Sequence, residues 1–436
     1  MSVVTPTSPL TRSLEARSWY EDSAGAWSRQ PPLEGTQRAD VAVVGAGLTG
    51  LTAALELKAR GFDVVVLEAR QVAWGASGRS GGQVIFGYGC EQAKLRRLVG
   101  AEEARRLFDW SLEGVKLIGD RCRAHAIDCD YVAGHAHAAI KPRQVDELKA
   151  WQADLEQHCG YTGMQLHEGA AARALVASER YRALLVDPRS GHLHPLKYTR
   201  GLAHAALEAG VRLHEGTAIT AIEDGTEVLL RSATGAQVRA PFAVLAGNAW
   251  LGRLQPALER RIMPVGTYIA ATEPLGAERA QALICQAIAV ADINFVLDYF
   301  RLSADHRLLF GGRVSYSGVD PPALATRLRH RMLQVFPSLQ HTAFSHVWGG
   351  LVDITMNRAP DFGRIGSHIY YAQGFSGHGI AATGLAGRVL AEAIAGQTGR
   401  LDVFSRIPHR AFPGGPWLRT PMLMLAMLAF RLRDAW

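Results

Sequence analysis

A strand, a glycine-rich turn and a helix follow one another directly in the stretch DVAVVGAGLTG, residues 40–50. The apolar run 41–44 predicts a short parallel strand that is covered on both faces. Gly45, Gly47 and Gly50 match the pattern G-x-G-x-x-G, whose glycines permit the turn, the approach of a pyrophosphate and close packing of the helix. Phosphate is favoured at the N-terminus of the helix that follows. The stretch therefore predicts a dinucleotide-binding unit.

The second strand of this unit ends in an acid. After a helix that ends near Gly61, the segment DVVVLEAR predicts a buried strand that finishes at Glu68, 18 residues beyond Gly50. A carboxylate at this place can accept hydrogen bonds from an adenosine ribose, and its charge would repel the 2′-phosphate of NADP. The unit alone leaves FAD and NAD as alternatives.

Length and composition indicate a globular protein of two or three domains, because 436 residues exceed what one core usually organises. With 48% hydrophobic and 20% charged residues, the chain is not of the disordered class. The formal charge of +7 is compatible with a nucleic-acid partner. The densest basic run, 327–331, nevertheless falls on an amphipathic pattern with Leu324, Leu328, Met332 and Phe336 on its other face. No aromatic residue interleaves this run, so a solvated helix face is favoured and nucleic acid is not expected to bind.

The two ends of the chain and its cysteines indicate a cytoplasmic location. Residues 1–36 contain no apolar run of signal-peptide length and predict an ordered arm anchored by Trp19, Tyr20 and Trp27. The five cysteines form no C-x-x-C pair, which predicts reduced thiols. The apolar segment 421–430 is too short to cross a membrane as a helix. A helix docked on the protein is favoured over peripheral contact with a membrane surface.

Between its ends the chain alternates helical and strand patterns. Helices are predicted at 91–125, 142–158 and in the first half of 196–223. A strand is predicted at 130–140, and a hairpin followed by a buried strand at 227–250, ending at Ala246, Gly247 and Asn248. Alternating patterns predict a largely antiparallel sheet from 263–274, 294–313 and 343–355.

A second glycine-rich loop favours FAD over NAD. In the segment YYAQGFSGHGI, a strand pattern ends at Gln373, and a helix is predicted from Gly379 to Ile394. The loop between them offers backbone amides at a helix N-terminus, which suit the negative charge that gathers on a flavin during reduction. A nicotinamide domain needs no such second loop. The glycines of 75–83 would likewise let the backbone approach the middle of an extended FAD.

Six segments together resemble the D-amino-acid-oxidase-like FAD oxidoreductases: VAVVGAGLTG, LEARQVAWGASGRSGGQ, LAGNAW, YFRLSADHRLLFGG, VWGGLVDITMNRAPDFGR and YYAQGFSGHGI. The resemblance covers nearly the whole chain. It implies an α/β fold, with a Rossmann-like FAD-binding domain of the glutathione-reductase type and a second, largely antiparallel α+β substrate domain. We expect an arm at 1–36, an FAD domain at 37–125, 190–260 and 345–412, a substrate domain at 126–189 and 261–344, and an apolar helix at 413–436.

The resemblance also implies which residues contact each part of FAD. The turn glycines and Glu68 would meet the ADP half, and Ala218 would meet the adenine through its backbone. Residues 77–83 would lie beside the ribityl chain and flavin, and residues 374–380 beside the isoalloxazine. The full expected set is Gly45, Ala46, Gly47, Leu48, Thr49, Gly50, Glu68, Ala69, Arg70, Gly75, Ala76, Ser77, Gly78, Arg79, Ser80, Gly81, Gly82, Gln83, Ala218, Ala246, Gly247, Asn248, Gly374, Phe375, Ser376, Gly377, His378, Gly379 and Ile380.

Three departures from relatives bear on mechanism. Ser80 stands where relatives often have asparagine. Some relatives tether FAD through a cysteine or histidine, but this chain has no cysteine beyond Cys285 and no histidine in GASGRSGG, which predicts non-covalent FAD. Sarcosine-oxidase-like relatives use a lysine to assist oxygen, and this chain has no lysine after Lys197. That absence weakens oxygen as the electron acceptor and keeps a quinone as the alternative.

The reaction implied by the resemblance is hydride transfer from the carbon beside an amine nitrogen to flavin N5, after which the imine is hydrolysed to an aldehyde. Catalytic candidates are His378, in the glycine loop, and Tyr268, Tyr299, Arg301 and Trp348, in the antiparallel sheet. Asp353 is a further candidate for substrate contact. An arginine could hold a carboxylate, and aromatic walls could steer an aliphatic chain. The alternative is that Tyr299 and Trp348 fill the core and that Arg301 pairs with Asp298 or Asp305.

Two short histidine patterns look like metal ligands at first sight. HAHAAI, beginning at His135, and HLH, at 192–194, lack the partners of a known metal site and are interpreted as strand residues, so no metal is expected.

The favoured function is FAD-dependent oxidation of gamma-glutamylputrescine or a related polyamine derivative. The alternatives are an amino-acid dehydrogenase that acts on a secondary or cyclic amino acid and passes electrons to a quinone, and a nucleic-acid-associated flavoprotein.

Overall fold

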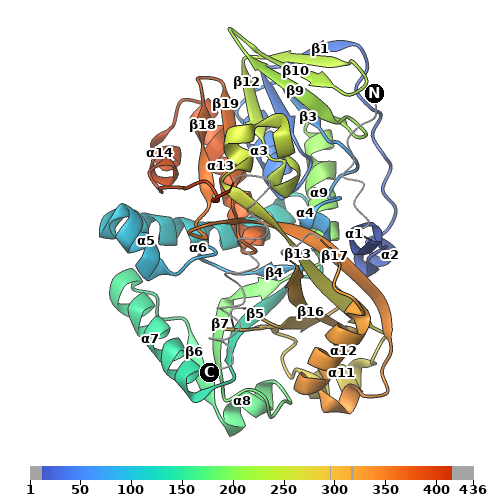
Figure 1. The fold of residues 1–436 in the computed structure, drawn as a ribbon, viewed down its shortest axis with the longest axis vertical. Coiled ribbons are helices and arrows are strands. Elements are labelled where there is room, and N and C mark those ends of the chain that lie inside the picture. The colour runs from blue at the N-terminus through green and yellow to red at the C-terminus, as the bar shows by residue number, and fades with distance from the viewer. Residues whose placement is uncertain (1–11, 295, 316–318, 415–436) are drawn as a thin grey trace.

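The computed structural model describes residues 12–294, 296–315 and 319–414. One half of the molecule is built on a six-stranded sheet with the strand order β18-β19-β12-β2-β3-β8 (Figure 1). Its strands are β2 (Val41–Val44), β3 (Val64–Leu67), β8 (Arg212–His214), β12 (Phe242–Leu245), β18 (Asp361–Ile365) and β19 (Ile369–Gln373). All neighbouring pairs are parallel except the edge pair β18 and β19. The predicted Rossmann-like domain is thus confirmed.

Both faces of this sheet are covered, which is why its strands are apolar throughout. Val41 and Val43 point into the core shared with α3 (Leu48–Ala59), α9 (Pro195–Glu208) and α13 (Gly379–Ile394). Ala42, between them, points into a second core under a four-stranded sheet. That sheet has the order β1-β11-β10-β9 and is built from β1 (Thr36–Arg38), β9 (Ile219–Asp224), β10 (Val228–Ser232) and β11 (Gln237–Ala240).

The other half of the molecule is built on a nine-stranded sheet with the strand order β17-β13-β16-β15-β14-β5-β7-β4, in which β6 also pairs with β7. All its paired strands run antiparallel except β5 and β14. Its strands are β4 (Gln83–Val84), β5 (Val132–Ala139), β6 (Gln165–Glu168), β7 (Ala183–His192), β13 (Ile262–Thr272), β14 (Ala289–Asp292), β15 (Tyr299–Leu302), β16 (Leu308–Ser315) and β17 (Phe344–Thr355). The largely antiparallel second sheet predicted from the sequence is confirmed.

Three segments assigned by sequence to the FAD domain, 83–84, 190–192 and 345–355, lie in this nine-stranded sheet. Strand alternation predicts that such a segment is extended but not which sheet it joins. The chain therefore passes repeatedly between the two halves, and loops from both halves meet where it crosses.

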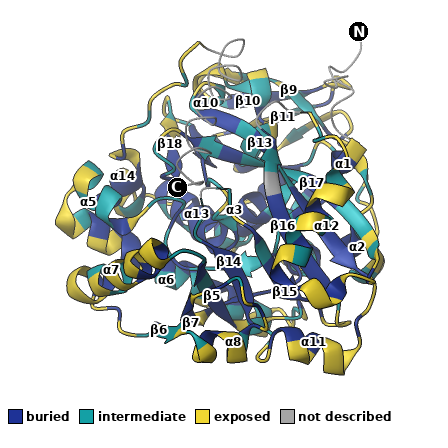
Figure 2. Ribbon diagram, turned by 60° about the horizontal axis from the view of Figure 1, so that its bottom comes forward, coloured by how far each residue is buried: buried dark blue, intermediate teal, exposed yellow. Residues whose placement is uncertain are grey.

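The two faces of the nine-stranded sheet differ. We call the face covered by α8 (Ala170–Leu175), α11 (Ala277–Leu283) and α12 (Leu324–Val335) the back face; its core contains Phe300 and Phe310. The opposite face, which we call the front face, turns toward the six-stranded sheet, and its Trp348 belongs to the same core as Val41. Figure 2 shows exposed residues on the outward sides of α8 and α11, while the strands above them are mostly buried.

The remaining helices connect these layers. The sequence predicts one helical region at 91–125, and the structure breaks it into α5 (Gln92–Val99) and α6 (Ala101–Ala124), because Gly100 takes a positive φ of 88°. The others are α1 (Arg12–Glu15), α2 (Trp19–Ser23), α4 (Ala76–Arg79), α7 (Pro142–Cys159), α10 (Pro256–Glu259), α14 (Gly399–Ser405) and the 3₁₀ turns η1 (Asn248–Trp250), η2 (Gly252–Leu254) and η3 (Pro337–Leu339).

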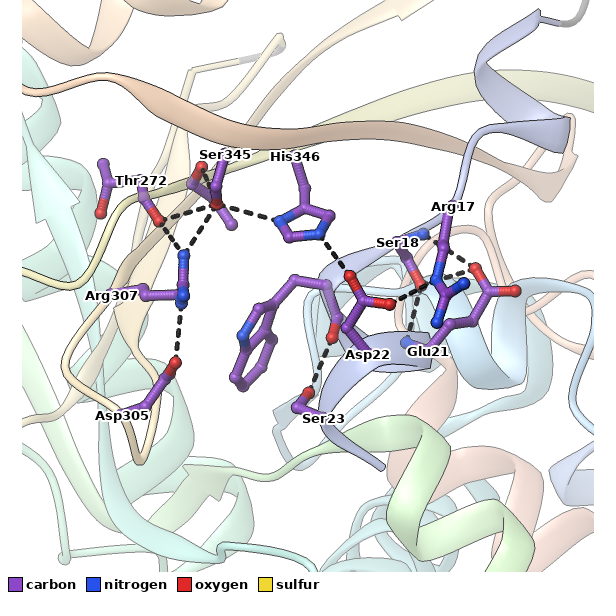
Figure 3. A network of polar contacts seen from close by, with 12 residues as sticks. Arg17, Ser18, Glu21, Asp22, Ser23, Thr272, Asp305, Arg307, Ser345 and His346 are labelled. Atoms are coloured by element: carbon purple, nitrogen blue, oxygen red, sulfur yellow. Dashed lines mark hydrogen bonds and ion pairs between the residues drawn. The ribbon is translucent and has the colours of Figure 1, made fainter. Parts of the chain in front are cut away.

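The N-terminal arm is anchored as the sequence predicts. Trp19 and Tyr20 are buried, and Ser18 and Glu21 form a capping box at the start of α2. Figure 3 shows a polar network that continues from this helix to the nine-stranded sheet: His346 Nε2 lies 2.8 Å from the Asp22 carboxylate, and its Nδ1 lies 2.9 Å from Ser345 Oγ.

The cysteines and the helices bear on two further features of the chain. All five cysteines are free. Within the described ranges, no helix has both the length and the apolar character that a membrane span requires. The segment 421–430 lies outside the described residues.

Candidate functional site

The predicted nucleotide turn forms where β2 meets α3. Gly45 takes a φ of 106°, and a Cβ at this glycine would stand 2.7 Å from the carbonyl oxygen of Ala246, at the end of the neighbouring strand β12. A Cβ at Gly50 would overlap the carbonyl oxygen of Gly45. Side chains are excluded at both positions, so the backbone of the turn is free to approach a phosphate group.

Glu68 joins the turn to the end of β3. Its Oε2 accepts the Ala46 N–H at 2.8 Å, and its Oε1 accepts the Arg70 N–H at 2.8 Å. Burial raises the pKa of Glu68, while these two amide donors favour the carboxylate and act in the opposite direction. The carboxylate therefore fixes the edge of the nucleotide cradle, and its contact with a ribose stays a prediction.

The loop 75–83, which we call the first glycine-rich loop, is held from three sides. Ser77 Oγ accepts the Leu48 N–H at 3.0 Å, which ties α4 to the start of α3. Arg79 is buried and donates to the carbonyls of Gly349, at 2.7 Å, and Ala16, at 2.6 Å. The Arg79 cation thus links the loop to β17 and to the N-terminal arm.

The second glycine-rich loop, 374–378, is held by Asp353 of β17. Its carboxylate accepts the N–H groups of Gly374 and, at 3.2 Å, of Phe375, while its backbone carbonyl accepts the Ser376 N–H at 2.9 Å. Burial raises the pKa of Asp353 to about 7, against these amide donors. Asp353 is therefore a loop-holding residue in this structure, and nothing places it against a substrate.

His378 ties the second glycine-rich loop to Phe86, just after β4. It lies at the N-terminus of α13, and its Nε2 is 2.7 Å from the carbonyl oxygen of Phe86. Because a carbonyl only accepts, Nε2 carries the hydrogen and Nδ1 carries a lone pair. Burial lowers the pKa of His378, so the imidazole is neutral.

Tyr299 lies on the front face against the first glycine-rich loop. A Cβ at Gly81 would stand 2.7 Å from its ring, and a Cβ at Gly311 would overlap the ring. Burial raises the pKa of Tyr299, so its phenol is neutral. The structure thus brings the ring of Tyr299, one of the sheet residues predicted from the sequence, to the loop at Gly81.

The guanidinium of Arg301 is already bonded to backbone carbonyls and to one hydroxyl. Its Nε donates to the Gly81 carbonyl at 2.8 Å, and its Nη2 donates to the Leu193 carbonyl at 2.9 Å and to the Tyr20 hydroxyl at 3.0 Å. It does not pair with Asp298 or Asp305, which contact Arg331 and Arg307 instead. These contacts indicate that Arg301 holds the first glycine-rich loop at Gly81 rather than binding a carboxylate.

Trp348 and Tyr268 are both buried. Trp348 donates its Nε1–H to the Arg79 carbonyl at 2.9 Å and thus supports the first glycine-rich loop. Tyr268 packs instead in a cluster with Ala270 and with Leu328 of α12, on the back-face side. Direct contact of either with a substrate stays a prediction.

The other predicted cofactor residues include Ala246, Ala218 and Ser80. Ala246 donates its N–H to the Val44 carbonyl at 2.9 Å, and η1 begins directly afterwards at Asn248, whose φ is 49°. The carbonyl of Ala218 accepts the Ala233 N–H at 2.8 Å. The buried Ser80 hydroxyl makes no hydrogen bond to any described residue, although buried hydroxyls usually find a partner. The glycine cradle and this free hydroxyl in the loop 75–83 fit the polar groups of a bound FAD.

Sequence reasoning missed the side chains that β5 brings to this place. His135 and His137 lie two residues apart on one strand face, and the pKa of each is lowered by burial and by nearby His378. The signal was present in the two-residue spacing of HAHAAI, but a single strand does not reveal what lies opposite it. Among the described residues, no group of three or more His, Cys, Asp and Glu side chains is arranged to hold a metal ion.

Comparison with known proteins agrees with this geometry. The family described as FAD dependent oxidoreductase (DAO) matches residues 40–393. Gamma-glutamylputrescine oxidoreductase of Escherichia coli K12 is 40% identical over 96% of this chain and 98% of its own. A probable oxidoreductase, OrdL, of Haemophilus influenzae is 39% identical over 96% and 97%. The crystal structure of glycine oxidase from Geobacillus kaustophilus has a TM-score of 0.72 at 22% identity, covering 86% of this chain and 100% of that one, and shares the fold.

Proposed function

Because this chain belongs to the DAO family of FAD-dependent oxidoreductases, we propose that it oxidises an amine of gamma-glutamylputrescine or of a related polyamine derivative. The observation that carries the proposal is the 40% identity to gamma-glutamylputrescine oxidoreductase over 96% of the chain. The matched region spans nearly the full length of both proteins, so it includes both glycine-rich loops and the front face as well as the nucleotide turn.

The chain's own residues would hold FAD along its length. The turn at Gly45 and the start of α3 would bind the pyrophosphate, and the Glu68 edge would bind the ribose. The loop 75–83, with the free Ser80 hydroxyl, and the loop at His378 would hold the flavin. When bound, FAD accepts the hydride from the carbon that carries the amine. The protein orients that carbon and keeps water out, and the released imine is hydrolysed to an aldehyde.

Attachment of FAD is proposed to be non-covalent. Neither glycine-rich loop contains a cysteine. Cys90, just beyond the first loop, is held as a thiol, because burial raises its pKa to about 11. His378, in the second loop, already uses its Nε2–H on the Phe86 carbonyl. Acid precipitation is therefore expected to release all of the flavin into the supernatant.

The decisive experiment is anaerobic mixing of the FAD-loaded protein with gamma-glutamylputrescine, putrescine, glycine and L-proline in turn, followed by flavin absorbance. Bleaching by gamma-glutamylputrescine at the lowest concentration supports the proposal. Bleaching by an amino acid instead would move the function to the amino-acid dehydrogenase class. Admission of air then identifies the acceptor: rapid recolouring means oxygen, whereas a persistently bleached flavin means a dehydrogenase that needs a quinone or another acceptor.

A further inference from the structure

The front face carries two histidines that no step above uses. In β5, His135 pairs with Ala289 and His137 with Ala291 of the parallel strand β14. Ala291 pairs in turn with Tyr299 of β15. Cross-strand partners share a sheet face, so both histidines lie on the front face with Tyr299. Their ring centroids are 4.6 Å apart.

Both histidines also lie beside the two glycine-rich loops. His135 Nε2 is 3.4 Å from Oε1 of Gln83, the last residue of the first loop. The second loop contributes His378, whose Nε2 is 2.7 Å from the Phe86 carbonyl oxygen. The ring of Phe86 stacks with Trp151, which lies edge-on to His137. The pair thus lies where the residues proposed to hold the flavin meet the nine-stranded sheet.

The hydrogen-bond network fixes which nitrogen of His135 carries the proton. Gln83 donates its Nε2–H to the Val290 carbonyl at 3.2 Å, so its Oε1 is the acceptor that faces His135. His135 Nε2 is therefore the donor, and Nδ1 carries a lone pair. That Nδ1 is buried and has no hydrogen-bond partner among the described residues.

His192, beside Gln83 on the adjacent strand, repeats this arrangement. Its Nε2 donates to the Ala287 carbonyl at 2.7 Å, and its Nδ1 is buried without a partner in the described structure. Together with His378, three imidazoles are fastened through Nε2–H and retain Nδ1 as an acceptor. A buried acceptor left without a donor loses its hydrogen bond to water and gains none in return. Such a site favours a ligand that brings N–H donors.

Aromatic rings adjoin the acceptors. The ring of His137 lies edge-on to Trp151 of α7 at 4.7 Å, and Trp151 stacks with Phe86 at 6.4 Å. Burial lowers the pKa of His137 to about 3, so this wall carries no positive charge that would repel an amine. The Nε2–H donors of His135, His192 and His378 are already used, so a carboxylate would find no donor from them.

We propose that His135 and His137 form the amine-recognition wall of the substrate site, with Nδ1 of His135 accepting a hydrogen bond from the substrate's amino group. The wall selects an alkyl amine that carries no carboxylate on the reacting carbon. Trp151 and Phe86 pack against its methylene chain. This inference rests on the proposed function, because it names the residues that would select the substrate at the same site.

The test compares FAD-loaded variants in anaerobic flavin reduction by gamma-glutamylputrescine. His135→Leu removes the acceptor and is expected to raise the apparent Kd at least about 10-fold, the factor that corresponds to about 1.4 kcal/mol. His135→Asn keeps an acceptor near the position of Nδ1 and should recover most of that loss. His137→Phe keeps the contact with Trp151 and should raise the apparent Kd by a smaller factor. The matched control is His330→Leu, an exposed histidine of α12, which should bind amine like the wild type.

A purely structural role predicts a different pattern. It would lower FAD content or thermal stability in His135→Leu and leave the apparent Kd of the loaded fraction within twofold of the wild type, which would overturn the inference. If His135→Leu does not fold, the same criterion applied to His137→Phe decides. Failure of the wild type to be reduced by any amine would instead reject the proposed function itself, so the two failures are distinguishable.

Discussion

The two faces of the nine-stranded sheet are built from the same strands but from different chemistry. On the back face, Phe300 and Phe310 stack with ring centroids 5.9 Å apart and pack against α12. One residue along the same strands, Tyr299 and Gly311 lie on the front face, where the tyrosine ring covers the glycine. The back face fills a core, whereas the front face meets the two glycine-rich loops.

This difference shows how a strand can serve stability and function at once. Alternation along β15 places each apolar residue against α12 and sends each polar neighbour toward the loops. Substitutions on the back face should therefore change the free energy of unfolding, and substitutions on the front face should change substrate binding or flavin reduction.

The largest expected effect is on the back face. Phe310→Ala should lower the free energy of unfolding by about 3–5 kcal/mol, because the residue is fully buried and its removal leaves a cavity. Denaturant titration measures the loss. The rate of flavin reduction per folded, FAD-loaded molecule should stay unchanged. A variant of normal stability with slowed reduction would break the distinction between the faces.

On the front face, Gly311→Ala should act on the site. The new Cβ would overlap the ring of Tyr299 and force it toward Gly81, at a cost of about 1–3 kcal/mol. We expect a changed visible spectrum of the bound flavin and a raised KM. Gly399→Ala is the control, because a Cβ at that glycine meets no atom within 4 Å. Equal spectra for both variants would argue against Tyr299 lying beside the flavin.

Asp353 tests how β17 holds the second loop. Its pKa is raised to about 7 in the folded protein, against an ordinary value of about 3.9 in the unfolded chain. The folded state then binds the proton more tightly between these values, so the free energy of unfolding should fall as pH rises from about 4 to 7. Asp353→Asn should flatten this slope and cost about 1 kcal/mol or more below pH 4 through its poorer fit to two amide donors. Parallel slopes in the two proteins would contradict the assignment.

The sequence predicts the local parts of the site well. The turn at Gly45, the acid at Glu68 and the helix 379–394 follow from short contiguous patterns, and each forms as expected because its contacts lie within one βαβ unit or one loop–helix junction. The parts of the site that are assembled from distant segments are harder to predict from the sequence. Nothing near Arg301 in sequence reveals that it bonds to Gly81, and nothing near His135 reveals Gln83. These contacts depend on the order of strands, which alternation alone does not specify.

The smallest expected effect lies on the surface at the N-terminal arm. His346 and then Arg17 lower the pKa of Asp22, so the stability that this contact provides is present above the ordinary aspartate pKa and is lost as pH falls through the lowered value. Asp22 is well exposed, so Asp22→Asn should cost less than about 1 kcal/mol and less still in high salt. Thermal melts at low and high salt measure this. A loss that is large and independent of salt would mean that the network in Figure 3 supports the site directly.

The most direct test of the proposed substrate site is a crystal structure of the FAD-loaded protein, reduced beforehand and soaked anaerobically with gamma-glutamylputrescine. We expect an amino group of the ligand to lie on the front face, within hydrogen-bond distance of His135 and beside the loop at His378. A ligand bound elsewhere, for example in the cavity of about 580 Å³ lined by Arg261, Arg364 and His409, with the front face empty, would contradict it.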